Sequence, residues 1–210
     1  MTDKSPNIVK TSIDGVVLIR RPIHGDFRGF VHEPYNRREL EEATGVDFHP
    51  VQWTHALMKP GVIKAIHTED WNKLVYPVTG ILYAPIVDLR LESKTFGKVE
   101  YITIDNTKED TKREALFLPG GGIGNSICVL GEEPMHYFYL IDEYWDDAKA
   151  KGIAWDDPDL NIKWPVKDPI LSERDKKNPT LRQVFPEKFG ANNILRQVGL
   201  GDSPGGRMIY

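Results

Sequence analysis

Short apolar runs, interrupted every few residues by Gly, Pro or Asp, fill the middle of the chain. Many of these runs are rich in β-branched and aromatic residues, which pack well on a half-buried pleated surface. Thr79-Gly80 separates two of the runs at the spacing of a β-hairpin. The pattern therefore predicts strands at Gly15–Arg20, Gly29–Glu33, Val51–Leu57, Val62–His67, Leu74–Val78, Ile81–Leu89, Lys98–Ile104, Ala115–Leu118, Ser126–Leu130 and His136–Ile141.

Helical signals are few. Asn36 offers an N-cap with Glu39 shortly after it, and Gly45 supplies a stop. A second helix is predicted at Asp146–Lys151, where Gly152 ends the pattern. Strands and helices do not alternate, which disfavours a Rossmann domain. Many short, evenly spaced strands predict instead an all-β barrel or jelly roll with a few short helices.

The chain of 210 residues has the length of a single domain. We expect a core at about residues 13–180. Beyond the predicted strands the sequence becomes turn-rich and aromatic, as in Trp155-Asp156-Asp157-Pro158 and Trp164-Pro165. This composition predicts a C-terminal segment that wraps over the barrel. We expect residues 181–210 to form a mobile or oligomer-contacting tail.

Composition excludes several classes of function. The net charge is −4 and the pI is near 5.9, which argues against non-specific nucleic-acid binding because such binding requires a basic face. The N-terminus is polar, and no window approaches the ~18 apolar residues of a membrane span, so we expect a cytoplasmic protein without membrane contacts. Cys128 is the single cysteine, and its apolar neighbours indicate a small core residue.

His67 is the most informative histidine because it ends a predicted strand close to two lysines. Lys64 precedes it on that strand, and Lys73 follows after one short loop. A histidine and an ammonium together suit proton abstraction beside a carbonyl, because the base takes the proton while the cation stabilises the enolate oxygen. The same residues also suit a solvated surface, so the pattern alone leaves both interpretations open.

The stretch from Gly61 to His67, with Glu69 just beyond it, also fits the first metal-binding signature of cupins. The second signature needs another histidine, but Pro119-Gly120-Gly121-Gly122-Ile123-Gly124 places Gly124 where that ligand would stand. One histidine and one carboxylate are too few ligands for a catalytic transition metal. We therefore expect no bound catalytic metal.

Three further stretches have both a structural and a functional interpretation. The glycine run before Asn125 is either a flexible hairpin or a backbone held close to a ligand, to which Asn125 would offer amide donors. Arg28 has the planar fork that suits a phosphate, and Glu33 either shares that site or is an ion-pair partner. In the strand at His136–Ile141, Tyr137 and Tyr139 share one face, while His136, Phe138 and Leu140 share the other.

Together these stretches resemble the nucleotide-sugar 3,5-epimerases typified by dTDP-4-dehydrorhamnose 3,5-epimerase. The family's order and approximate spacing are kept from about residue 13 to 180. The matching stretches are Asp26-Phe27-Arg28-Gly29 with Glu33, Val51-Gln52, Lys64-Ala65-Ile66-His67, Lys73-Leu74-Val75 with Gly80, Val87-Asp88-Leu89-Arg90 with Ser93-Lys94-Thr95-Phe96-Gly97, Trp155-Asp156-Asp157-Pro158, Trp164-Pro165 and Leu171-Ser172-Glu173-Arg174-Asp175.

The resemblance implies a homodimeric jelly roll of the cupin type whose N-terminal strands cross into the partner, and an activity that needs no cofactor. It implies that His67 abstracts the proton, that Asp175 pairs with His67, and that Lys73 steadies the enolate oxygen. The implied substrate is a nucleotide-diphosphate sugar. The positions that grip its nucleotide or diphosphate match Arg28, Glu33, Gln52 and Tyr144.

Three positions depart from the family pattern. Lys64 replaces an arginine, and Gly124 replaces a second histidine, in a Gly-Asn-Ser sequence that resembles a branch acting on heptose nucleotides. Counting back from Tyr144 places the acid-donating tyrosine of the family at Phe138, which has no proton to donate. We therefore hypothesise that one carbon is epimerised, C3 or C5, with Tyr139 or a water as the proton donor. A register shift of one residue would instead put Tyr139 in the site and predict epimerisation at both carbons.

Three other functions remain as alternatives. A ketoisomerase that moves the carbonyl between C3 and C4 would use the same histidine and enolate. A catalytically inactive sugar-nucleotide-binding protein is disfavoured because His67, Lys73 and Asp175 are all present. A metal-dependent cupin oxygenase is disfavoured because a ligand is missing.

Overall fold

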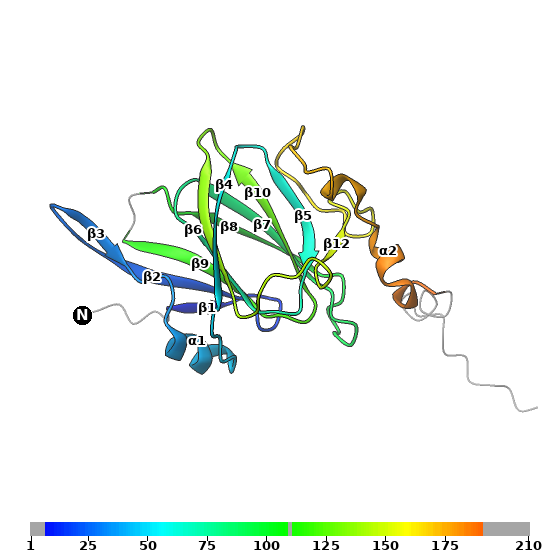
Figure 1. Cartoon of the computed structure of the whole chain (residues 1–210), viewed down its shortest axis with the longest axis horizontal. Helices are drawn as coiled ribbons and strands as arrows, with labels where there is room; N and C mark the ends of the chain where they lie inside the picture. The colour runs from blue at the N-terminus through cyan, green and yellow to red at the C-terminus, as the bar shows by residue number, and fades with distance from the viewer. Residues whose placement is uncertain (1–6, 109–110, 191–210) are drawn as a thin grey trace, which may run out of the picture.

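A computed structural model of the chain describes residues 7–108 and 111–190. Its strands form two antiparallel sheets (Figure 1). The seven-stranded sheet has the order β1-β2-β9-β6-β11-β4, with β3 paired to β2, and the five-stranded sheet has the order β12-β5-β10-β7-β8. The strands are β1 (Ile8–Lys10), β2 (Val17–Asp26), β3 (Gly29–His32), β4 (Gln52–Met58), β5 (Ile63–Thr68), β6 (Lys73–Pro77), β7 (Ile81–Asp88), β8 (Val99–Asp105), β9 (Lys112–Leu118), β10 (Ile123–Leu130), β11 (Met135–Ile141) and β12 (Lys151–Ile153).

The prediction of an all-β jelly roll is confirmed, and every predicted strand is present. The largest difference in bounds is in β2, which continues to Asp26 and pairs there with β3. The sequence pattern does not predict β1 and β12, because three residues are too few to show an alternation of apolar and polar side chains.

Three apolar clusters stabilise the barrel. The largest lies between the sheets and joins Leu82 and Ile104 of the five-stranded sheet to Leu116 and Tyr137 of the seven-stranded sheet. A second covers the outer face of the seven-stranded sheet, and a third joins the five-stranded sheet to the C-terminal segment. Cys128 is fully buried, and burial raises the pKa of its thiol to about 11, so its assignment to the core is confirmed.

The helix predicted between Asn36 and Gly45 is confirmed as α1 (Arg37–Thr44). The Asn36 side chain accepts a hydrogen bond from the N–H of Glu39. Gly45 ends the helix with a φ of 73°, a left-handed conformation in which a side chain would be strained, and donates its N–H to the Glu41 carbonyl. No helix among the described residues is long and apolar enough to cross a membrane.

The helix predicted at Asp146–Lys151 is wrong. These residues form turns that lead into β12, and β12 pairs with β5. In that pairing Gly152 lies opposite His67 and against the Asn178 side chain, where a Cβ would come within 2.7 Å. Sheet pairing and close packing outweigh the local helical tendency of a short polar segment.

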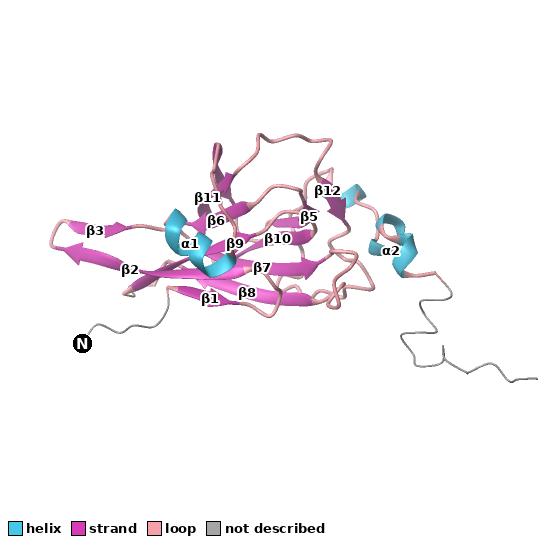
Figure 2. Ribbon diagram, turned by 90° about the horizontal axis from the view of Figure 1, so that it is seen from below, coloured by secondary structure: helices cyan, strands magenta, loops and turns pink. Residues whose placement is uncertain are grey.

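The C-terminal segment wraps over the five-stranded sheet as predicted, beside β5 and β12 (Figure 2). It contains the 3₁₀ turns η1 (Asp175–Lys177) and η2 (Pro186–Lys188) and the helix α2 (Leu181–Val184). Leu181 is buried in the third cluster, so the packed part of the chain extends beyond residue 180. The remainder of the predicted tail, residues 191–210, lies outside the described residues.

Candidate active site

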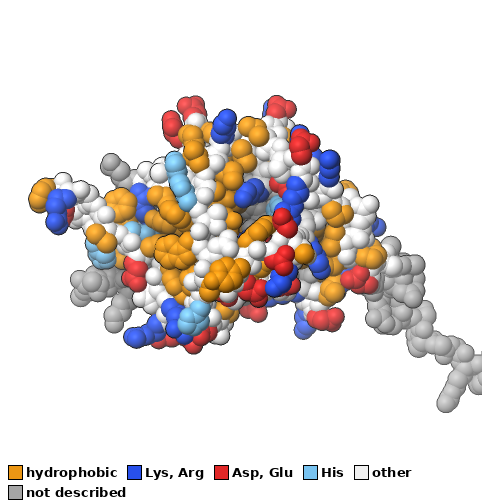
Figure 3. Space-filling model, viewed as in Figure 1, with side chains coloured by type: hydrophobic (Ala, Val, Ile, Leu, Met, Phe, Trp, Pro, Cys, Tyr) orange, Lys and Arg blue, Asp and Glu red, His pale blue; other side chains and the backbone are white. Residues whose placement is uncertain are grey.

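A cavity of about 360 Å³ opens beside β5, β6, β10 and β11. This volume is at the lower end of the range of small-molecule sites. In the space-filling view, charged side chains gather beside a hollow whose other side is hydrophobic (Figure 3). The polar side chains that line the cavity are Lys64, His67, Glu69, Lys73, Asn125, Tyr137, Tyr139, Ser172, Arg174 and Asp175.

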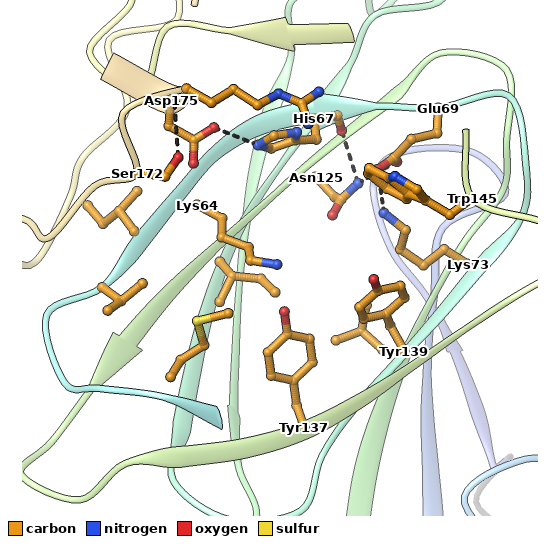
Figure 4. A pocket seen from close by; sticks show the side chains of 16 residues that line it. Lys64, His67, Glu69, Lys73, Asn125, Tyr137, Tyr139, Trp145, Ser172 and Asp175 are labelled. Carbon is orange, nitrogen blue, oxygen red and sulfur yellow. Dashed lines mark hydrogen bonds and ion pairs between the residues drawn. The ribbon is translucent and has the colours of Figure 1, made fainter. Parts of the chain in front are cut away.

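His67 on β5 and Asp175 on η1 form the first polar pair of the cavity. Nε2 of His67 lies 2.9 Å from Oδ1 of Asp175 (Figure 4). Burial opposes ionisation of the Asp175 carboxyl, but the hydrogen bonds from His67 and the Ala65 N–H outweigh burial and lower its pKa. An ionised Asp175 accepts the proton on Nε2, and this tautomer leaves Nδ1 of His67 free to accept a proton.

Lys73 and Glu69 form the second pair. The Lys73 Nζ lies 2.6 Å from Oε1 of Glu69, and both residues are buried. Asn125 donates one hydrogen bond to Oε2 of Glu69 over 3.1 Å and another to the His67 carbonyl over 2.9 Å. The amide donors of Asn125 are therefore used within the protein, which corrects the expectation that they face a ligand; its Oδ1 remains as an acceptor.

Tyr137 and Tyr139 extend from β11 into the cavity, on the side opposite His67 (Figure 4). The Lys64 Nζ lies 5.8 Å from the centroid of the Tyr137 ring and 6.0 Å from that of Tyr139. Tyr137 is fully buried, and among the described residues its hydroxyl has no hydrogen-bond partner. Burial raises the pKa of Tyr137 although the Lys64 charge opposes this. Two phenols therefore face the histidine.

Phe138 lies on the other face of β11, so its predicted place in the site is wrong. Its ring stacks on His55 with 4.9 Å between the ring centroids, and it packs on the outer face of the seven-stranded sheet. Successive side chains of a strand point to opposite faces, so an error of one residue exchanges Phe138 for a tyrosine. The structural reason for a single-carbon epimerase is thereby lost.

Two of the residues expected at the nucleotide lie away from the cavity of their own chain. Arg28 stands at the tip of the β2–β3 hairpin, which projects from the barrel (Figure 1), and its guanidinium pairs with Asp26 at 2.5 Å. Glu33 follows this hairpin and pairs with Arg21 at 2.7 Å.

The other two lie near the mouth of the cavity without lining it. Oε1 of Gln52 accepts the backbone N–H of Trp145 over 3.0 Å, and the Trp145 side chain lines the cavity. Tyr144 is 75% exposed. Gln52 on β4 is thus bonded to a residue of the cavity lining, and Tyr144 directly precedes that residue on the loop after β11.

Several glycines of the run before Asn125 allow close packing of the backbone, a role that the sequence interpretation did not include. A Cβ at Gly120 would overlap the Asp70 carbonyl, and one at Gly124 would lie 2.7 Å from Cγ2 of Ile66. A histidine could not occupy position 124 without displacing the core. The side chain that enters the cavity from this part of β10 is Asn125.

The sequence profile of the dTDP-4-dehydrorhamnose 3,5-epimerase family matches residues 10–183. The chain belongs to this family.

Relatives in this family include enzymes named for one and for two epimerised carbons. The dTDP-4-dehydrorhamnose 3,5-epimerase of Shigella flexneri is 34% identical over 173 residues, which are 80% of this chain and 92% of that protein. The dTDP-4-dehydrorhamnose 3-epimerase of Streptomyces niveus is 33% identical over 168 residues, 78% of each chain. The structure of the Legionella pneumophila dTDP-6-deoxy-D-glucose-3,5-epimerase, in complex with dTDP-4-keto-L-rhamnose, matches with a TM-score of 0.78 and 28% identity, covering 86% of this chain and 95% of that one.

Membership of the epimerase family agrees with the chemistry of the donor groups. Among the described residues, no group of three or more His, Cys, Asp and Glu side chains is placed to hold a metal ion. Glu69, the carboxylate of the cupin-like signature, is instead bonded to Lys73 and Asn125.

The sequence interpretation missed several side chains of this epimerase cavity, among them Glu69, Tyr137 and Trp145. The cupin-like signature suggests Glu69 only as a metal ligand. Its separation of four residues from Lys73 also allows an ion pair across the loop between them. Tyr137 was assigned to the same face as Tyr139 but not to the site. Trp145 directly follows Tyr144, and no pattern distinguishes which of these two aromatic side chains enters the cavity.

Proposed function

We propose that this chain epimerises a nucleoside-diphosphate 4-keto-6-deoxy sugar by removing and returning a proton next to the ketone. The observation that carries the proposal is the opposition of His67, paired with Asp175, and Tyr139 across one cavity that also contains Lys73. The names of the relatives support the same class of substrate, and the Legionella pneumophila enzyme was solved with such a sugar bound.

The arrangement supports a two-step reaction. Nδ1 of His67 takes the proton from the carbon beside the ketone, and the electron pair of the broken C–H bond moves onto the ketone oxygen. The Lys73 ammonium stabilises this enolate oxygen. The Tyr139 hydroxyl then gives its proton to the opposite face of the same carbon, which inverts the carbon and leaves a phenolate. Solvent returns a proton to the phenolate and takes the proton from His67, which restores both groups. Each positioned acid or base contributes about 10²–10⁴-fold to such a rate.

Tyr139 is favoured over Tyr137 as the acid because of its position relative to Lys73. The Lys73 Nζ lies 5.8 Å from the centroid of the Tyr139 ring. If the ammonium holds the ketone oxygen, Tyr139 is close to the carbon bonded to the ketone carbon, where the proton is returned. Tyr137 lies beside Lys64 instead.

We propose that both C3 and C5 are epimerised. Phe138 does not occupy the position of the proton donor, because its side chain lies on the other face of β11. A tyrosine in that position can give a proton to C3 or to C5, whichever carbon lies between Tyr139 and His67. Membership of the family does not decide how many carbons are epimerised, since the relatives include a 3,5-epimerase and a 3-epimerase.

The proposal is tested by incubating the purified protein in D₂O with nucleotide 4-keto-6-deoxy sugars and with a heptose analogue, and by following the C3 and C5 protons by NMR. We expect deuterium at both carbons together with inverted product. Exchange at one carbon would support a monoepimerase. A carbonyl signal moved to C3 would identify a ketoisomerase, and binding without exchange with every sugar would contradict catalysis.

We further propose that two copies of the chain form a homodimer in which each hairpin reaches the partner's cavity. The hairpin places Arg28 far from its own cavity, and it exposes Phe27, Phe30 and Val31 by 97%, 51% and 72%. Exposed apolar side chains beside a projecting cation suit a contact with a second copy. Light scattering is expected to give the mass of a dimer. Mixing Arg28→Gln and His67→Asn proteins should then restore activity that neither has alone, and a monomeric mass would contradict the proposal.

A further inference from the structure

We infer that Glu69, held by Asn125, is a positioning residue that fixes the Lys73 ammonium where the enolate oxygen forms. The inference rests on the proposed function. Glu69, Lys73 and Asn125 are exposed by only 6%, 8% and 8%, so water does little to satisfy their polar atoms. Both carboxylate oxygens of Glu69 have a partner, Oε1 with Lys73 and Oε2 with Asn125.

This bonding pattern fixes the orientation of the carboxylate. A carboxylate bonded through one oxygen rotates about its own axis, whereas one bonded through both oxygens does not. Asn125 also donates to the backbone carbonyl of His67, so the Glu69 carboxylate is tied to the strand that carries the base. The cation and the base are thereby held at a constant separation, which a reaction with a short-lived enolate requires.

The charges around Lys73 explain why it needs this partner. Burial lowers the pKa of Lys73, the Lys64 ammonium lowers it further, and Glu69 opposes both. The Tyr139 ring lies beside the ammonium but carries no formal charge. The other carboxylate of the cavity, Asp175, is bonded to His67. A third cation of the lining, Arg174, pairs with Asp147. Without Glu69, the Lys64 and Lys73 ammonium groups would share the cavity with no carboxylate bonded to Lys73, and Lys73 would lose its proton or turn away.

Other roles for Glu69 fit the contacts less well. A second catalytic base would present a free oxygen to the substrate, but both oxygens of Glu69 are occupied. A metal site would need further ligands, and the part of the chain that the structure describes provides no such group around Glu69.

The test is the Glu69→Gln variant, which keeps the shape of the side chain and removes its charge. We expect kcat to fall about tenfold while KM changes by less than about threefold, because the lost interaction acts on the enolate rather than on the bound ground state. The decrease in kcat should become larger as the pH rises, because the Lys73 ammonium without its counter-charge gives up its proton at a lower pH. The basic limb of the kcat profile should therefore move to lower pH.

A double-mutant cycle separates this positioning from a merely structural role. If Glu69 acts through Lys73, then Glu69→Gln has no further effect on kcat in a Lys73→Met background. Asn125→Ala should shift the basic limb in the same direction by a smaller amount. Additive losses in the cycle, or an unmoved pH profile in a folded Glu69→Gln protein, would overturn the inference.

A measurement without substrate keeps this inference separate from the proposed function. The Lys73 ammonium can be titrated by ¹⁵N NMR in the free wild-type and Glu69→Gln proteins. A midpoint that moves to lower pH in the variant supports the role of Glu69 even if no sugar is epimerised. An unchanged midpoint overturns it even if the wild-type protein is an active epimerase.

Discussion

His67→Asn is expected to lower deuterium incorporation at C3 and C5 by about 10²–10⁴-fold while the protein stays folded. Asparagine can still donate a hydrogen bond to Asp175, but it has no nitrogen that accepts a proton near neutral pH. The measurement is the NMR exchange assay in D₂O, combined with thermal unfolding of both proteins. The substitution adds no volume to the lining of the cavity, so substrate binding should be retained.

His49→Asn is the matched control for this prediction. His49 lies outside the cavity, where Nε2 is 2.9 Å from the Asp47 carboxylate, so the same substitution removes an imidazole without touching the site. We expect exchange at the wild-type rate. If His67→Asn exchanged as fast as His49→Asn, His67 would not be the base and the mechanism would be wrong.

The pair of His67 with Asp175 also shows which part of the site the sequence predicts well. Both residues lie in stretches with a specific order of residue types, and the structure brings them together although 108 positions separate them. A resemblance based on such stretches assigns both residues to the same site without any knowledge of the three-dimensional fold. The resemblance alone therefore predicts the pairing of these two residues.

The positions predicted least well are those where the two-residue period of a strand decides the answer. In Tyr137-Phe138-Tyr139, an error of one residue replaces a phenol in the cavity by a ring on the opposite face. In β10, Asn125 enters the cavity as predicted, and the pairing with β5 shifts only after it, between Asn125 and Ile127. Local irregularities of this kind leave no clear signal in a sequence.

Contacts across loops, and the contact proposed between two copies of the chain, form a third group. Lys73 begins β6, but Glu69 lies in the preceding loop, where no periodicity relates the two side chains. The proposed role of Arg28 depends on a partner molecule, because its hairpin projects from its own barrel. The sequence shows that Glu69, Lys73 and Arg28 are charged side chains that can form ion pairs or bind a ligand. The packing of the chain decides which partner each of them binds.

Tyr139→Phe is expected to separate inversion from exchange. The variant keeps His67, which removes a proton and returns a deuteron to the same face of the carbon. Inversion should fall by about 10²–10⁴-fold, because no acid remains on the opposite face. Deuterium should still enter the substrate without inversion. The measurement is NMR of the recovered sugar in D₂O, which distinguishes labelled substrate from labelled product.

Tyr137→Phe is the matched control, since it removes the same atom from the same strand and the same face. The Tyr139 ring lies beside Lys73 as well as Lys64, whereas Tyr137 lies beside Lys64, so we expect Tyr137→Phe to retain inversion. The reverse result, with inversion lost in Tyr137→Phe and kept in Tyr139→Phe, would move the acid to Tyr137. The enolate oxygen would then lie closer to Lys64, because the proton is returned to a carbon adjacent to the one that bears that oxygen.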